Sequence, residues 1–383
     1  MTTQHLAVLS LGTNMGDREH NINQCIERIH ATIATVVKIS SIYETPAMGF
    51  TGAEFYNCAL SVHTAHSAQT LLTRLQLLEQ ELGRTRSGNG YESRIIDIDL
   101  VAFDEQIIRS EQLEVPHPRM QDRKFVLLPM LDLELDWRHP ILQNNLHALL
   151  DATSDRSQCK KVASARNNLS QYGLDKYNYI AIEGNIGAGK TTLTTKIAED
   201  FKAKTVLERF ADNPFLPKFY EDQPRYAFPL EMSFLADRYQ QISDDLSQFD
   251  LFSEFIIADY HIFKSLIFAK VTLGEDEYRL YRKLFDIIYR EMPKPGLYVY
   301  LYQNTERLLQ NIRKRGRDYE QEIPAEYLEK INRGYLEYIK SQTDLNILVI
   351  DVSDRDFVEN QQDYIYILEQ IAAKTAGRGN TFS

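Results

Sequence analysis

The residues with the clearest capacity for chemistry form a glycine-rich segment near the middle of the chain. Gly184-Asn185-Ile186-Gly187-Ala188-Gly189-Lys190-Thr191-Thr192 fits the pattern G-x-x-x-x-G-K-[ST], between a strand-like and a helix-like run. Glycines let the backbone turn its N–H groups towards a phosphate, and a helix start adds partial positive charge. Lys190 is expected to reach the outer phosphates and the Thr191 hydroxyl to bind Mg²⁺. The second half of the chain is therefore expected to bind a nucleoside triphosphate.

A second candidate is a pair of carboxylates in the first half. Asp97 and Asp99 lie in an apolar run, and alternate residues of a strand share a face. Two carboxylates about 7 Å apart at Cα suit a pair of Mg²⁺ ions that bridge a polyphosphate. A strand with one solvated face would show the same spacing, so spacing alone leaves both interpretations open. The nearby Arg84 and Arg94 favour the metal–nucleotide site because guanidinium groups suit phosphate oxygens.

Composition divides the chain of 383 residues into two parts. Nineteen of the 22 tyrosines lie after position 160, whereas eight of the nine histidines lie before it. This length suggests two or three domains. We predict a first domain over 1–155, a linker over 156–176, which is polar and lacks a strong strand, and a second domain over 177–383.

The overall charge and the cysteines exclude several classes of protein. The net charge of −11 leaves no basic face for nucleic acid, so small-molecule substrates are expected. The three cysteines are too widely spaced for a disulfide framework or a metal site. No signal peptide opens the chain and no apolar run approaches ~20 residues, so a soluble cytoplasmic protein without membrane contact is expected.

The elements that must position these residues differ between the halves. In the first half, strands at 6–11, 36–45, 55–63 and 94–103 and helices at 17–33 and 67–82, the second capped by Ser67, give α+β patterning. In the second half, strands at 179–182, 205–207, 297–302 and 347–351 alternate with helices at 228–246, 256–272, 275–291, 305–317 and 325–341. Such alternation predicts a three-layer α/β domain with a parallel sheet.

Five motifs in the first half together resemble the 6-hydroxymethyl-7,8-dihydropterin pyrophosphokinase family of folate synthesis. They are Ser10-Leu11-Gly12-Thr13-Asn14, Tyr43-Glu44-Thr45-Pro46, Phe55-Tyr56-Asn57, the segment from Arg94 to Asp99, and Val115-Pro116-His117-Pro118-Arg119-Met120. The resemblance covers about residues 4 to 150. It implies a ferredoxin-like α+β fold and the transfer of the β,γ-pyrophosphate of ATP to the pterin hydroxymethyl group.

The resemblance also assigns roles to residues. It implies that Asp97 and Asp99 hold two Mg²⁺ ions, that Arg84, Arg94 and Arg123 contact phosphates, and that His117 contacts the nucleotide. It implies that Phe55 and Phe125 sandwich the pterin, with Thr45, Pro46 and Asn57 at its polar edge; Glu79 also matches a family position. Aromatic faces and a few polar partners suit a flat heteroaromatic ring. Tyr91-Glu92-Ser93 departs from the Trp-Gly-Pro that the family often shows, which affects the loop expected to close over the site.

Two features of the second half point to phosphoryl transfer. Glu208 follows a predicted strand and can accept a proton from an attacking hydroxyl, although an exposed glutamate there is the commoner case. Arg313, Arg315 and Arg317 can offset charge on a transferred phosphoryl group from a closing lid. A basic, solvated helix end, favourable to the helix dipole, is the alternative for these arginines.

The second half resembles the deoxynucleoside kinase family over about residues 177 to 372. The motifs are Gly184 to Thr192, Glu208, Asn213-Pro214, Phe219-Tyr220, Phe228-Pro229-Leu230-Glu231, Arg313 to Arg317, Glu320 and Ile323-Pro324-Ala325-Glu326-Tyr327-Leu328. The resemblance implies that Glu208 is the general base for the 5′-hydroxyl, that Tyr220 and Glu320 hold the 3′-hydroxyl, and that position 231 faces the base. The residues expected at ATP are Gly184, Asn185, Gly187, Ala188, Gly189, Lys190, Thr191, Thr192 and Arg317 here, with His117 and Arg123 in the first half.

Two departures from this second family concern the catalytic motif and the base. Phe252-Ser253-Glu254-Phe255 stands where an acidic-Arg-Ser motif is often found after the third strand, and Glu254 is expected to keep the acidic role. Glu231 stands where Gln is usual. Because an ionised carboxylate only accepts hydrogen bonds, it favours guanine, which presents two adjacent donors. A protonated Glu231 would resemble Gln and admit adenine.

The sequence thus predicts a bifunctional ATP-dependent enzyme that makes dihydropterin pyrophosphate and phosphorylates a deoxynucleoside, with a purine favoured. Two Mg²⁺ ions are expected in the first site and one in the second. Two alternatives for the second half stay open: a nucleoside monophosphate kinase, and a non-catalytic nucleotide-sensing or dimerisation module. A homodimer formed through the second half is a further hypothesis.

Overall fold

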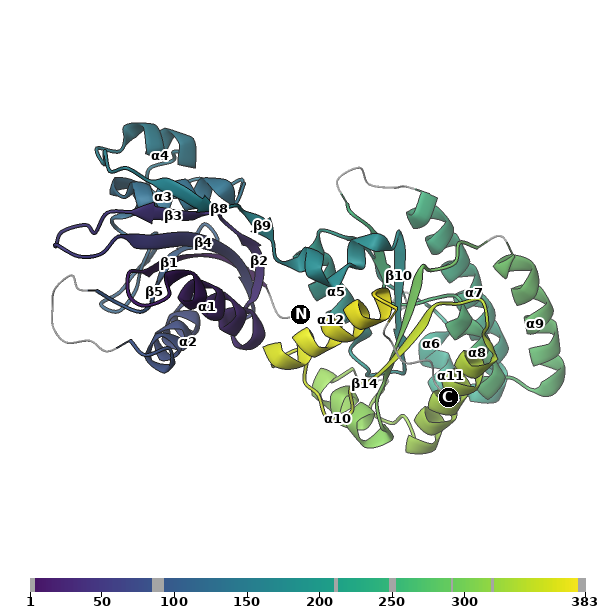
Figure 1. Ribbon diagram of the computed structural model, residues 1–383. Coiled ribbons are helices and arrows are strands. Elements are labelled where there is room, and N and C mark those ends of the chain that lie inside the picture. The colour runs from purple at the N-terminus through teal and green to yellow at the C-terminus, as the bar shows by residue number, and fades with distance from the viewer. Residues whose placement is uncertain are drawn as a thin grey trace. The chain divides into compact units, whose positions relative to one another are not determined.

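The chain forms two compact units in a computed structural model, which describes residues 4–84, 93–209, 213–247, 253–290, 292–317 and 320–377 (Figure 1). The first unit runs up to Gln171 and includes Glu359–Ile365. The second comprises Tyr172–Val358 and the residues from Tyr366 onward. No helix in the described ranges has the length and apolar character needed to cross a membrane.

The first unit is built on an antiparallel sheet. Its main strands are β1 (His5–Thr13), β2 (Thr35–Ile39), β3 (Ile42–Thr45), β4 (Phe55–Thr64) and β5 (Asp97–Phe103). The central order is β5-β1-β4-β2, and β3 also pairs with β4. This order and the intervening helices are those of a ferredoxin-like fold, so the predicted fold class is confirmed. A separate small sheet joins β6 (Ile108–Arg109) to β7 (Glu114–Val115).

Helices cover both faces of this sheet. They are α1 (Arg18–Thr32), α2 (Ala68–Glu81), α3 (Lys124–Asp132) and α4 (Leu146–Ala152), with a 3₁₀ turn at Met120–Asp122. Leu9 of β1 packs in the core with α1 and α2, whereas its neighbour Val8 packs in the core with α3 and α4. Ile98 of β5 lies in the first of these cores. Because strand residues alternate, Asp97 and Asp99 are left on the α3 side.

The segment expected to be a linker contributes strands instead. β8 (Lys160–Ala163) pairs with β3, and β9 (Arg166–Asn167) pairs with β2, both antiparallel. The segment 156–176, predicted as a linker that lacks a strong strand, thus supplies two short strands to the first sheet. Two 3₁₀ turns, Leu169–Tyr172 and Leu174–Lys176, lead into the second unit. We propose that the first domain extends to Gln171 rather than to residue 155.

The second unit contains a five-stranded parallel sheet in the order β11-β12-β10-β13-β14. Its strands are β10 (Tyr179–Gly184), β11 (Lys204–Val206), β12 (Ile256–Ala258), β13 (Leu297–Tyr302) and β14 (Ile347–Asp351). Its helices are α5 (Lys190–Phe201), α6 (Leu216–Glu221), α7 (Gln223–Ser247), α8 (Phe263–Thr272), α9 (Glu275–Tyr289), α10 (Thr305–Arg315), α11 (Ala325–Ser341) and α12 (Gln361–Thr375). Helices flank both faces of the sheet, as predicted for a three-layer P-loop fold (Figure 1).

One strand of this sheet replaces the start of a predicted helix. The apolar run Ile256-Ile257-Ala258 forms β12, fully paired between β10 and β11, and α8 begins only at Phe263. Three apolar residues carry no usable periodicity, so they cannot be told from a helix start. The acidic residue after the third strand is therefore Asp259. Glu254 precedes the strand and is exposed, so its expected acidic role is wrong.

Candidate active sites

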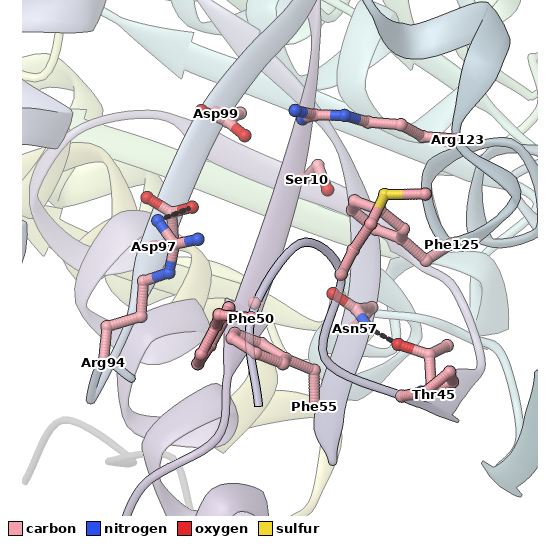
Figure 2. A pocket seen from close by; sticks show the side chains of 13 residues that line it. Ser10, Thr45, Phe50, Phe55, Asn57, Arg94, Asp97, Asp99, Arg123 and Phe125 are labelled. Atoms are coloured by element: carbon pink, nitrogen blue, oxygen red, sulfur yellow. Dashed lines mark hydrogen bonds and ion pairs between the residues drawn. The ribbon is translucent and has the colours of Figure 1, made fainter. Parts of the chain in front are cut away.

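A cleft on the α3 side of the first unit gathers most of the residues predicted there. It is about 560 Å³ in volume and lined by Ser10, Gly12, Thr45, Pro46, Met48, Phe50, Phe55, Asn57, Arg94, Asp97, Asp99, Arg123 and Phe125 (Figure 2). Strand register explains this gathering. Gly12 pairs with Asn57 on one side and with Asp97 on the other. Residues far apart in sequence are thus brought to one face of the sheet.

The two carboxylates of β5 have different surroundings. Arg84 Nη1 donates to Asp97 Oδ1 (2.5 Å), and Arg94 Nη1 lies 2.7 Å from Asp97 Oδ2. Asp99 points towards Arg123 in Figure 2 but makes no ion pair with a described residue. Burial, reinforced by the charge of Asp97, raises the pKa of Asp99 to about 6. A bound cation would offset both effects, so the pair fits Mg²⁺.

Asp97 and Asp99 also line a second, adjoining cleft. Its other predicted members are Arg84, Glu79 and His117. Burial raises the pKa of Glu79 to about 7 and lowers that of His117 to about 4. His117 is therefore neutral near pH 7; since its Nδ1 accepts from Arg119 N (3.3 Å), its Nε2 carries the proton and can donate. The carboxylate pair lies between two pockets, as transfer between two bound substrates requires.

The aromatic residues of the first cleft stand beside hydrogen-bonding groups. Asn57 Nδ2 donates to Thr45 Oγ1 (2.7 Å), and both residues are buried. The guanidinium carbon of Arg94 lies 5.8 Å from the ring centre of Phe55. That of Arg123 lies 5.6 Å from the ring centre of Phe125. Flat rings, an amide and a hydroxyl therefore share one pocket. Tyr91 and Glu92 lie outside the described residues.

The glycine-rich loop of the second unit has the geometry its sequence predicts. Gly187 and Gly189 adopt φ of 83° and 80°, in the left-handed region. A Cβ on Gly189 would lie 2.7 Å from the Phe357 ring, so the backbone passes too close for a side chain. Lys190 opens α5, and burial, with the like charge of Lys264, lowers its pKa to about 8.

Other residues of the loop hold it in place. Asn185 Nδ2 donates to Leu328 O and to Asn332 Oδ1, both at 2.8 Å, so its side chain anchors the loop to α11. Ala188 is buried and Thr192 is exposed. Lys190 Nζ donates to Asn185 O (2.9 Å) across the loop. The Lys190 ammonium can leave this carbonyl for a phosphate oxygen.

Glu208 is held between two cations. Lys264 Nζ donates to its Oε2 (2.5 Å), and Arg238 Nε and Nη2 donate to its Oε1 (2.9 and 2.7 Å). Burial opposes the charged form, but Lys264 and Arg238 outweigh burial and hold the pKa of the Glu208 carboxyl well below its usual range. Glu208 is therefore an ionised acceptor with a fixed orientation.

Sequence reasoning missed three residues of this cleft. Thr191 Oγ1 donates to Asp259 Oδ2, and Glu208 N donates to Asp259 Oδ1 (2.7 Å), so Asp259 joins the phosphate loop to Glu208. The side chains of Thr191 and Asp259 offer oxygen ligands of the kind that Mg²⁺ prefers, so they fit one Mg²⁺. Arg238 and Lys264 were the other two. Arg238 follows Glu231 by seven residues on α7. This spacing puts both residues on one side of the helix and could have indicated that they share a site.

Some of the remaining predicted residues line a cleft of about 870 Å³ in the second unit, and others do not. Glu231, Arg315, Arg317 and Glu320 line it, together with Lys190, Thr191 and Glu208. Arg315 donates to Glu320, and Arg317 Nη1 lies 3.3 Å from Glu320 Oε1. Arg313, also described, is exposed and is not among the lining residues. Tyr220 belongs to α6, but its side chain lies outside the described part.

Glu231 is one of the buried polar residues that line this cleft. It is 3% exposed, and its Oε1 accepts from Thr272 Oγ1 (2.9 Å). Its Oε2 has no hydrogen-bond partner among the described residues. Burial raises the pKa of Glu231 to about 7. An unpartnered oxygen beside Phe234 and Leu230 leaves a place for one polar edge of a bound ring.

The two units match two family models. The deoxynucleoside kinase model matches residues 180–375, and the 7,8-dihydro-6-hydroxymethylpterin-pyrophosphokinase model matches residues 8–135. A deoxyguanosine kinase of Bacillus subtilis (strain 168) is 40% identical over 199 residues, 51% of this chain and 94% of that protein. A deoxyadenosine/deoxycytidine kinase of that strain is 29% identical over 209 residues, 54% and 96% of the two chains. The 2-amino-4-hydroxy-6-hydroxymethyldihydropteridine pyrophosphokinase of the same strain is 42% identical over 131 residues, which are 34% of this chain and 78% of that protein.

Proposed function

The chain belongs to the deoxynucleoside kinase family and, through its first unit, to the hydroxymethylpterin pyrophosphokinase family, and we propose that both units are active in one molecule. Both families imply ATP as co-substrate and generally Mg²⁺. The first unit transfers the β,γ-pyrophosphate of ATP to the hydroxymethyl group of 6-hydroxymethyl-7,8-dihydropterin. The second transfers the γ-phosphoryl group to the 5′-hydroxyl of a deoxynucleoside. The observation that carries the proposal is that each unit brings its own charged groups together in a cleft of its own.

In the first unit, the chain holds the pterin on one side of the carboxylate pair and ATP on the other. Phe55 and Phe125 bind the ring faces, and Asn57 its polar edge. Asp97 and Asp99 would hold two Mg²⁺ ions, which would neutralise phosphate charge and orient the transferred group. Arg84, Arg94 and Arg123 contact the phosphates, with His117 donating to the nucleotide.

In the second unit, Glu208 orients the 5′-hydroxyl and takes its proton. A carboxylate with so low a pKa is a weak base, so its effect comes mainly from position. The loose transition state of phosphoryl transfer tolerates this, because little bond formation to the hydroxyl oxygen is needed early. Arg315 and Arg317 can turn from Glu320 to the phosphoryl oxygens, while Thr191 and Asp259 would hold one Mg²⁺.

Glu231 supports a preference for a purine, and for guanine above adenine. Guanine presents N1–H and the 2-amino group, and an ionised Glu231 can accept both. Adenine offers one donor beside a lone pair, which an ionised carboxylate repels. The 40% identity to a deoxyguanosine kinase, against 29% to a deoxyadenosine/deoxycytidine kinase, supports the same preference.

The products of ATP test the proposed reactions. Pyrophosphoryl transfer leaves AMP, whereas transfer of one phosphoryl group leaves ADP. The full chain with MgATP should form AMP with the dihydropterin and ADP with deoxyguanosine. ADP formed with dGMP but not with deoxyguanosine would make the second unit a monophosphate kinase. ATP binding without turnover of any deoxynucleoside or monophosphate would make it a sensor or dimerisation module.

We further propose a cytoplasmic enzyme that pairs through its kinase unit. Leu280 and Ile287 lie seven residues apart on α9 and are 51% and 64% exposed, so two apolar side chains share one exposed side of a helix whose other exposed residues are mostly charged. Sedimentation of the full chain, with Ile287→Glu as the comparison, measures the pairing. A monomer at micromolar concentration for the unmutated chain would contradict it.

A further inference from the structure

The chain that leaves α4 returns to the start of α3. Asp155 Oδ2 accepts a hydrogen bond from Lys124 N (2.9 Å), and its Oδ1 accepts one from Ser157 N (2.8 Å). Lys124 Nζ donates to Ser157 O (3.3 Å). The backbone of Lys124, between two residues that line the first cleft, is therefore held by a residue 31 positions later in the chain.

This contact supplies a cap that α3 otherwise lacks. The first N–H groups of a helix have no partners within the helix, and a short polar side chain at the N-cap normally accepts one. The N-cap of α3 is Arg123, which makes no such bond. Arg123 has only donors, and its guanidinium lies in the cleft. Asp155 provides the acceptor, and its negative charge also suits a helix N-terminus.

The charge of Asp155 is secure at working pH. Burial opposes ionisation, but the hydrogen bonds from Ser157 and Lys124 outweigh burial and lower the pKa of the Asp155 carboxyl. A lowered carboxyl pKa means that the stabilisation is present above the usual aspartate range and is lost only in stronger acid. The cap therefore persists across the neutral range.

The same segment also contacts a second element that lines the cleft. β8 pairs with β3 in the register Tyr43↔Lys161 and Glu44↔Lys160. β3 ends at Thr45, which lines the cleft and accepts a hydrogen bond from Asn57. Residues 155–163 thus contact both α3, which carries Phe125, and β3, which ends at Thr45.

We propose that residues 155–163 are a positioning element of the first active site, and that Asp155 acts through the Lys124 backbone to set Arg123 and Phe125. This inference rests on the proposed pterin reaction. Asp155 contacts neither substrate pocket, so it is not a catalytic residue. Its loss would turn the α3 start and misalign a ring platform and a phosphate-binding arginine, which effective catalysis tolerates poorly.

The test uses the full chain with Asp155→Ala, Asp155→Asn and the control Asp151→Ala, whose side chain is exposed at the end of α4. Amide hydrogen exchange of residues 123–127 should be about fivefold faster in Asp155→Ala than in the control. The kcat/KM for the dihydropterin should fall by a similar factor, about fivefold, with most of the change in KM. Asp155→Asn, which keeps one acceptor oxygen, should recover part of both effects.

Several outcomes overturn the inference. Unchanged exchange in Asp155→Ala would show that the cap does not hold α3, and faster exchange with unchanged pterin kinetics would show a purely structural cap. An equal fall of AMP and ADP formation would indicate general damage to the chain. If the unmutated chain forms no AMP, the proposed function fails instead, and the exchange measurement still reports whether Asp155 fixes the start of α3.

Discussion

The two clefts place a buried carboxylate in opposite electrostatic settings. In the first unit, Asp99 makes no ion pair with a described residue, and burial beside Asp97 raises its pKa to about 6. In the second unit, Glu208 is in direct contact with Lys264 and Arg238, and its pKa is held well below the usual range. Neither carboxylate is exposed, and the direct contact with two cations that Glu208 makes accounts for the difference.

This difference assigns different tasks to the same functional group. A carboxylate that burial destabilises gains from a cation that arrives with the substrate, which is the behaviour of a metal ligand. A carboxylate whose charge is already balanced by the protein has a fixed orientation and gains less from an added cation. Asp99 is therefore the carboxylate that gains most from a bound Mg²⁺. Asp97 already pairs with Arg84 and Arg94, and the second unit supplies the cations around Glu208 from α7 and α8.

The largest expected effect is the loss of the metal ligands. Asp97→Ala or Asp99→Ala should abolish AMP formation, because metal coordination contributes several kcal/mol to the transition state, on the order of 10³-fold or more in rate. The measurement is the initial rate of AMP formation with saturating MgATP and pterin. Asp151→Ala is the matched control. Normal turnover in either variant would remove that residue from the metal site.

A smaller effect is expected at the carboxylate that the protein itself balances. Glu208→Gln keeps size but removes both the proton acceptor and the charge through which Lys264 and Arg238 fix its position, so kcat for the deoxynucleoside should fall by roughly 10² to 10⁴ with little change in KM. A kcat near that of the unmutated chain would refute the role of Glu208. The opposite split, with KM raised and kcat unchanged, would assign Glu208 to binding alone.

The smallest effect concerns the choice of base and depends on pH. Because the pKa of Glu231 is raised to about 7, the carboxyl is protonated below that pH and ionised above it. The ratio of kcat/KM for deoxyguanosine to that for deoxyadenosine should therefore rise as pH increases from 6 to 8, by about tenfold if one hydrogen bond changes. In Glu231→Gln the ratio should be flat. A pH-dependent ratio in that variant would assign the titration to another group.

The sequence predicted the elements that have strong periodicity or capping signals. Ser67 caps α2 as expected, since its Oγ accepts from Thr70 N (3.3 Å). The glycine loop and the alternation of Asp97 and Asp99 are local patterns, and local patterns can be read from one chain. The site residues that these patterns position were therefore within reach of sequence analysis.

What the sequence did not reveal depends on pairing between distant segments. β12 is only three residues long, and its strand character comes from its neighbours in the sheet. β8 carries the exposed Lys160 and Lys161, so it shows no apolar alternation and is held by backbone pairing with β3. Arg238 and Lys264 acquire their role only because the fold brings Glu208 between them. The sequence around Asp155 indicates only a polar loop, because the contact of Asp155 with the start of α3 arises from the fold.

The most direct test of two separate active sites in one chain measures both products of ATP in one mixture. The full chain, Asp99→Ala and Glu208→Gln are each given MgATP, the dihydropterin and deoxyguanosine, and AMP and ADP are quantified together. We expect Asp99→Ala to lose AMP and keep ADP, and Glu208→Gln to lose most of its ADP and keep AMP. Loss of both products in either variant, or of neither in both, would contradict the account.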